Sequence, residues 1–345
     1  MNMKIQMTIA GLIAAGALAG CQRSDAPPPD APPAAAAPAE PAGPPAEIVI
    51  PGERLITESL TSTSDGTVII GSMLGKTIFK AAPGASTAEA WIQPGTDGLA
   101  GVFGVFADEA SGTLWACSGN PPGPPQPGAP PPTPSALHAF DLATGVPKGK
   151  WELPGKDAFC NDIAVDAAGN AYVSDTNGMG VDVLKKGASK LEHWAGNGAF
   201  GAPGGVLDGI AVLGDKVVVN VLLRGQLFVA PIGADGKAGK VTEVKLDRAL
   251  SGPDGHRAWG KALLVAEGTA PGRLSRVDFT NEDLTEGKVT TIKEGFPDGP
   301  VAVTVVGETA YVLEGQLSLI MGPPGAAPAA PKPFKATAVP VGSAP

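Results

Sequence analysis

A repeated phrase in the sequence limits the fold more than any other feature. Each copy opens on a polar residue, runs through an apolar strand to a glycine turn, and returns through a second strand rich in β-branched residues. The opening positions Asn161, Asp208, Asp254 and Gly299 lie 47, 46 and 45 residues apart. A repeat of about 40–50 residues with this strand pattern is typical of a four-stranded propeller blade.

The first half of the chain carries two further copies. Between Glu58, which opens one copy, and Asn161 lie 103 residues, which fit two blades and a Pro-rich insert at 119–135. Turn signals such as Asp65-Gly66 separate strands with period-2 alternation. The sequence therefore predicts an all-β fold, a six-bladed β-propeller of four-stranded antiparallel blades, over residues 47–320.

A closed ring removes the exposed strand edges that an open stack of blades would leave. Closure usually takes a strand from one end of the chain. We expect the apolar segment 48–50 to complete the last blade, with 334–341 as the alternative, and the sequence does not decide between them.

The N-terminal residues have the pattern of an export signal. Lys4 precedes an apolar run from Ile5 to Leu18, which ends in small residues directly before Cys21. This run is shorter than the roughly 20 residues of a membrane-spanning helix. We expect residues 1–20 to be a lipoprotein signal peptide and Cys21 to be lipidated, with a linker rich in Pro and Ala at 21–46. Gln22 favours an outer-membrane anchor that faces the periplasm.

Net charge bears on the class of binding partner, and cysteine content on a possible disulfide. The net charge is −9, with no cluster of Lys or Arg, which argues against a nucleic-acid partner. Residues 321–345 are rich in Pro and Ala and are expected to form a C-terminal tail. With Cys21 lipidated, Cys117 and Cys160 remain as a candidate disulfide pair in an oxidising compartment. We expect a monomer.

The opening positions are candidates for a metal site. The innermost strand of each blade lines the central channel, so the opening positions would form a ring at its mouth. Four of these positions are polar: Glu58, Asn161, Asp208 and Asp254. A non-polar residue near Phe103 or Gly104 would be the fifth member of the ring, and Gly299 the sixth. Carboxylates packed together need a cation, and hard oxygen ligands point to Ca²⁺, or to Mg²⁺ or Mn²⁺. The alternative is turn capping, because Asp and Asn often open strands by bonding their own backbone.

Other polar residues have weaker patterns. A second set of polar residues ends the second strand of several blades: Asp175, Asn220, Glu267 and Glu314. For these residues we favour turn capping over contacts to a ligand. The insert at 119–135 would be either a lid over the mouth or a solvated loop. The three histidines share no position in the repeat.

These copies resemble the senescence-marker-protein/gluconolactonase superfamily, whose relatives include paraoxonases and strictosidine-synthase-like proteins. The resemblance rests on Glu58 in TESL, Asn161 in FCNDIAV, Asp208 in LDGIAV and Asp254 in GPDG. It implies a six-bladed propeller with a catalytic divalent cation, often Ca²⁺ or Zn²⁺, held by Glu, Asn and Asp residues at these four positions. The His pair that paraoxonases place beside the metal has no counterpart here.

Two functions remain open at this point. The first is a metal-dependent lactonase or ester hydrolase of the cell envelope, acting on a small lactone or ester, in which Asp254 is both a metal ligand and the base that accepts a proton from water. The second is a non-catalytic binding or scaffold propeller. A redox quinoprotein is disfavoured because the blades lack a Trp-rich repeat.

Overall fold

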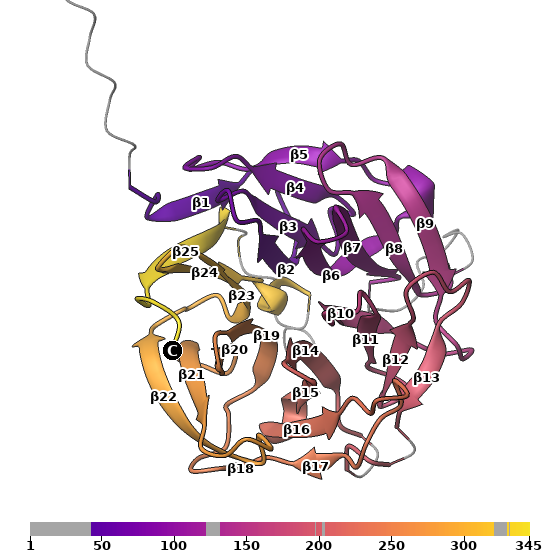
Figure 1. The fold of residues 1–345 in the computed structure, drawn as a ribbon. Helices are drawn as coiled ribbons and strands as arrows, with labels where there is room; N and C mark the ends of the chain where they lie inside the picture. The colour runs from indigo at the N-terminus through magenta and orange to yellow at the C-terminus, as the bar shows by residue number, and fades with distance from the viewer. Residues whose placement is uncertain (1–42, 122–131, 197, 202–203, 321–329, 331) are drawn as a thin grey trace, which may run out of the picture. The chain divides into compact units, whose positions relative to one another are not determined.

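The computed structural model describes residues 43–121, 132–196, 198–201, 204–320, 330 and 332–345. These residues belong to one compact unit, Ala42–Pro345. Six sheets surround a central axis within this unit (Figure 1). Their innermost strands contact one another in a closed circle. The predicted six-bladed propeller is confirmed.

Each of the first three blades takes four antiparallel strands from one continuous stretch of chain, with the innermost strand first. Blade 1 has β2 (Thr57–Ser62), β3 (Val68–Ser72), β4 (Ile78–Ala81) and β5 (Glu89–Ile92); blade 2 has β6 (Gly101–Asp108), β7 (Thr113–Gly119), β8 (Ala136–Asp141) and β9 (Pro147–Glu152); blade 3 has β10 (Cys160–Val165), β11 (Ala171–Asp175), β12 (Gly180–Leu184) and β13 (Glu192–Ala195).

Blades 4 to 6 follow the same plan with two additions, a parallel fifth strand on blade 5 and a composite blade 6. Blade 4 has β14 (Leu207–Leu213), β15 (Lys216–Val221), β16 (Gln226–Pro231) and β17 (Thr242–Glu243); blade 5 has β19 (Pro253–Trp259), β20 (Ala262–Glu267), β21 (Arg273–Phe279), β22 (Glu286–Glu294) and β18 (Lys245–Leu246); blade 6 has β23 (Pro300–Val306), β24 (Thr309–Glu314), β25 (Phe334–Pro340) and β1 (Glu47–Ile50). Three single-turn 3₁₀ helices complete the described elements: η1 (Thr96–Gly98), η2 (Leu222–Arg224) and η3 (Leu317–Leu319).

The strands form where the sequence alternates apolar residues with turn residues. In β15, Val217, Val218 and Val219 are all buried, because both faces of the strand pack within the propeller. The hairpin that joins β2 to β3 turns at Gly66, whose φ of 93° is accessible mainly to glycine. This is one of the turns that the sequence predicts.

Both ends of the chain close blade 6. β25 pairs with β24, and β1 pairs with β25 as the outermost strand. The two segments that the sequence offers as alternatives are therefore both used. The propeller consequently extends past the expected boundary at residue 320, because Phe334 and Ala336 of the expected tail are fully buried in the core. The Pro and Ala content of the preceding residues conceals this strand in the sequence.

The structure joins Cys117 of β7 to Cys160 of β10 by a disulfide, with 5.1 Å between their Cα atoms. The bond links blades 2 and 3. The expected signal peptide, Cys21 and nearly all of the linker lie outside the described residues, as does most of the Pro-rich insert. Within the described part of the chain, we find no helix with the length and apolarity needed to cross a membrane.

Candidate functional site

The innermost strand of every blade contains a β-bulge near its first residue. In β10, for example, Cys160 pairs with Asp175 and Ile163 pairs with Val173, so Asn161 and Asp162 share the step between them. A bulge bends the strand and redirects side chains that regular pairing would fix. The four predicted ligand residues all occupy bulges: Glu58, Asn161, Asp208 and Asp254.

The other two blades place apolar residues at these bulges. Blade 6 has Val301 there, whereas the sequence pattern predicts Gly299. Gly299 has a φ of 73° and belongs to the turn before β23, which explains the error of two residues. In blade 2, a Cβ atom on Gly104 would lie 2.5 Å from the backbone oxygen of Asn161. A glycine therefore allows the bulges of blades 2 and 3 to meet.

The structure brings the four predicted side chains together. The Asn161 amide donates a hydrogen bond to Asp208, and a second side-chain hydrogen bond joins Asp254 to Asp208. Asn161, Asp208 and Asp254 are each at most 8% exposed. Glu58 is partly exposed as a residue, but its Oε2 atom is buried without a hydrogen-bond partner.

Burial and like charge raise the pKa values of these carboxyls. Burial, together with Asp208 and Asp162, raises the pKa of Glu58 to about 8. Burial and Asp162 raise the pKa of Asp208 to about 7. Burial, Asp208 and Glu58 raise the pKa of Asp254 well above its ordinary value. Burial and neighbouring negative charge thus favour the neutral forms of these carboxyls.

The residues at the mouth suit a divalent cation in their chemistry. They offer hard oxygen donors with uncompensated charge, and Glu58 Oε2 has no other partner. Among the described residues, however, no three or more His, Cys, Asp or Glu side chains form a group that could hold a metal ion. A cation bound there would relieve the repulsion among these carboxyls.

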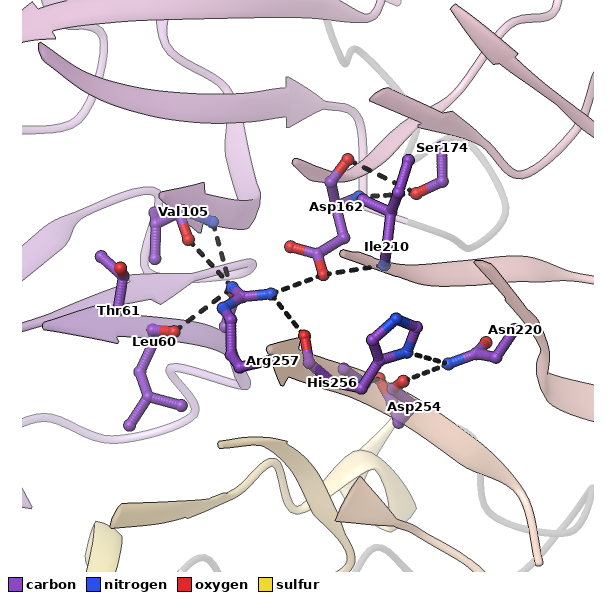
Figure 2. Close-up of polar contacts among 12 residues, drawn as sticks. Leu60, Thr61, Val105, Asp162, Ser174, Ile210, Asn220, Asp254, His256 and Arg257 are labelled. Carbon is purple, nitrogen blue, oxygen red and sulfur yellow. Dashed lines mark hydrogen bonds and ion pairs between the residues drawn. The ribbon is translucent and has the colours of Figure 1, made fainter. Parts of the chain in front are cut away.

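A further buried carboxylate, that of Asp162 next to Asn161, is paired with an arginine. Arg257 of β19 lies 2.8 Å from Asp162 through its Nη1 atom, and both residues are buried (Figure 2). Its Nη2 atom donates to the backbone oxygens of Val105 at 3.0 Å and Leu60 at 3.3 Å. The Asp162 carboxylate also accepts from the backbone of Ile210 at 3.3 Å. This pair thus ties together blades 1 to 5.

Sequence reasoning missed this pair. Arg257 lies in β19 directly after His256, and its partner Asp162 is 95 residues away. An arginine at an inward-facing position of the innermost strand was the available signal, since such a charge needs a buried partner.

Asn220 and His256 support the neighbouring bulge. Asn220 donates through Nδ2 to the backbone oxygen of Asp254 at 2.5 Å and lies 3.2 Å from Nδ1 of His256 (Figure 2). Burial lowers the pKa of His256 to about 4, so the imidazole is neutral at physiological pH. A Cβ atom on Gly209 would meet Asn220 Nδ2 at 2.9 Å, so this contact needs the glycine beside Asp208.

The other residues that end second strands act mostly as turn caps. Asp175 accepts hydrogen bonds from the backbone of Phe159 and Gly178, and Glu314 accepts from Asp298. Glu267 is held by Arg248, with oxygen–nitrogen distances of 2.8 and 2.9 Å. The favoured capping interpretation holds for Asp175 and Glu314, whereas Glu267 is chiefly the partner of Arg248 and Asn220 contacts the candidate site.

The Pro-rich insert leaves blade 2 on the same face. Asn120 and Thr133 close its base with two hydrogen bonds, of 2.6 and 3.2 Å. Residues 122–131 lie outside the described part of the chain, so neither the lid nor the loop interpretation is tested.

No protein-family model and no curated protein matches the sequence. Solved structures do match the fold. A luciferin-regenerating enzyme aligns with a TM-score of 0.58 at 13% identity, covering 85% of this chain and 97% of that one. The six-bladed propeller is thus shared. The calcium-binding protein regucalcin from Agrobacterium tumefaciens gives 0.56 at 15% identity (86% and 98% covered), and a gluconolactonase from Xanthomonas campestris gives 0.55 at 14% (82% and 86%).

Proposed function

We propose that the protein is a divalent-metal-dependent hydrolase of lactones or related esters. The observation that supports this proposal is that the buried Asp208 and Asp254 and the carboxyl of Glu58 lie near enough for their charges to act on one another, while Glu58 Oε2 has no hydrogen-bond partner. Buried like charges are costly and are usually retained for function. The shared fold with a gluconolactonase is consistent with this chemistry, although fold alone does not fix function.

Each residue at the mouth has a role in this proposal. Glu58, Asn161 and Asp208 would hold the cation, with Ca²⁺ favoured and Zn²⁺ as the alternative. When bound, such an ion polarises the substrate carbonyl and lowers the pKa of water. Asp254 accepts a proton as the water oxygen bonds to the carbonyl carbon. The ring C–O bond then breaks, and the proton passes from Asp254 to the leaving alkoxide to give the hydroxy acid.

The test compares carboxylates that have different roles. Purified protein with Ca²⁺ or Zn²⁺ should hydrolyse a member of a lactone and aryl-ester panel, and EDTA should abolish the rate. Asp254→Asn should keep most of the metal and lose about 10²-fold or more in kcat/KM, because the amide cannot accept the proton. Glu58→Ala should lose metal and activity together.

Asp235→Asn is the control. Asp235 is exposed, is paired with Lys237 at 2.8 Å and lies outside the ring of opening positions. This variant should change the rate little. Metal binding without turnover of any substrate would favour the alternative function, a non-catalytic binding or scaffold propeller. Activity that survives complete metal removal would contradict the mechanism.

We also propose that Cys21 anchors the protein to the cell envelope, on the outer membrane facing the periplasm. The support is the apolar run that ends in Leu18-Ala19-Gly20-Cys21. Cys21→Ser should abolish incorporation of labelled palmitate and move the protein from the membrane fraction to the soluble fraction. Label that persists in the variant would show that Cys21 is not the lipidated residue.

A further inference from the structure

A pocket of about 330 Å³ opens beside Asp254 on the mouth face. It lies between blades 5 and 6, and the turn after β15 closes one side. Asp254 lines it, as does Val301, the bulge residue of blade 6. This volume lies at the lower end of the range for small-ligand sites. The pocket therefore adjoins the proposed base and is large enough for part of a small substrate.

The lining of the pocket is mostly apolar. Side chains from four separate turns and strands supply hydrocarbon surface, while the hydroxyls of Thr269 and Ser318 are both exposed. Three glycines, Gly252, Gly268 and Gly299, contribute only backbone atoms to the lining. The apolar residues are Leu222, Pro297, Pro300, Val301 and Leu317.

The charges of the pocket are all negative. Asp254 and Asp298 are its charged residues, and no Lys, Arg or His is among the described residues that line it. The nearest cation in contact is Lys332, which is committed to Asp298. A carboxylate on the substrate would face repulsion here with no compensating partner, and the hydroxyls of a polyhydroxylated ring that face the five apolar residues would lose their hydration without a partner.

We infer that this pocket binds the hydrocarbon substituent of an uncharged lactone or ester whose carbonyl lies at the mouth. The inference rests on the proposed function and adds the class of substrate: alkyl-substituted and neutral. Leu222 of blade 4 and Leu317 of blade 6 would contact the substituent from two sides, so they would set specificity without touching the reacting atoms.

The first experiment measures kcat/KM for δ-lactones that carry no substituent, methyl, propyl or pentyl, and for a polyhydroxylated δ-lactone of the same ring size. Each methylene that enters the pocket should raise kcat/KM by about threefold to fourfold. The polyhydroxylated lactone should be the poorest substrate. A preference for it, or rates independent of chain length, would overturn the inference.

Variants locate the effect in the pocket. Leu222→Lys should lower kcat/KM for the propyl lactone by about tenfold or more and leave the unsubstituted lactone nearly unchanged. Leu223→Lys is the matched control, because Leu223 is on the same η2 turn, is 65% exposed and does not line the pocket. Thr269→Lys places the same charge from an exposed lining position, in case Leu222→Lys folds poorly. Equal losses for Leu222→Lys, Thr269→Lys and Leu223→Lys would place the substituent elsewhere.

A binding measurement separates this inference from the proposed function. If wild-type protein hydrolyses no lactone, titration calorimetry with the unreactive δ-lactams, propyl-substituted and unsubstituted, still tests the pocket. Tighter binding of the propyl lactam that is lost in Leu222→Lys would support the pocket while the hydrolase proposal fails. Equal binding of the two lactams, or no binding of either, would overturn the pocket assignment itself.

Discussion

Two neighbouring sets of buried charge in the central channel are balanced in opposite ways. At the mouth, burial and nearby carboxyls raise the pKa values of Glu58, Asp208 and Asp254. Beside them, Asp162 is paired with Arg257, which also bonds to backbone oxygens of blades 1 and 2, and we call this pair the floor pair. Both regions are built from the same bulged strands. The charge of Asp162 is thus balanced within the fold, although Asp162 Oδ1 and Arg257 Nε have no hydrogen-bond partner, whereas the mouth keeps carboxyls that an external cation can balance.

The floor pair should give the largest effect on stability. Arg257→Met leaves Asp162 buried and unpaired and should lower the free energy of unfolding by about 3–5 kcal/mol in chemical denaturation. Arg276→Met is the control, since Arg276 forms a 2.8 Å pair with Asp278 that is about one-third exposed on both sides. That variant should lose no more than about 1 kcal/mol.

A double variant sharpens the result. Arg257→Met combined with Asp162→Leu removes both charges and should recover much of the lost stability, because an apolar replacement of a buried pair is often nearly neutral. A loss for Arg257→Met no greater than that for Arg276→Met would show that the floor pair does not join the blades as described.

The two regions also differ in how far the sequence predicts them. The mouth residues recur at fixed repeat positions, so the blade period alone brings Glu58, Asn161, Asp208 and Asp254 to one place. The floor pair depends on side chains that cross the channel between blades 3 and 5, and no periodic pattern encodes such a contact. The sequence offers the segment of β25 only as an alternative closing strand for a related reason: its place in blade 6 comes from long-range pairing with β24, not from local composition.

The mouth should respond to pH and to cations together. The pKa of Glu58 is raised to about 8 and that of Asp208 to about 7, so the folded protein binds more protons than the unfolded chain between roughly pH 4 and 8. The stabilisation from these groups is present below about pH 4 and is lost as the pH rises through 7 to 8. Metal-free protein should therefore unfold at a lower temperature at pH 8 than at pH 5.

Added Ca²⁺ should reverse this loss. At 100 times its Kd a ligand of the folded state contributes about 2.7 kcal/mol, and the rise in Tm should be larger at pH 8 than at pH 5, where protons compete for the same oxygens. Thermal unfolding with Ca²⁺ or EDTA at both pH values makes the measurement. An equal rise at both pH values would place the cation away from the mouth carboxylates.

The smallest predicted effect is a gain in the free energy of unfolding, opposite in sign to the loss expected for Arg257→Met. Glu58→Gln removes a buried negative charge from beside Asp208, so at pH 8 and without metal it should raise the free energy of unfolding by about 1 kcal/mol, as substitutions at strained functional sites often do. At pH 5 the wild-type carboxyl is already protonated, and the two proteins should be nearly equally stable, which gives an internal control. The exposed Glu282→Gln should change stability little at either pH. A loss of stability at pH 8 in Glu58→Gln would mean that Glu58 is satisfied within the fold, as Asp162 is, and the contrast between mouth and floor would no longer hold.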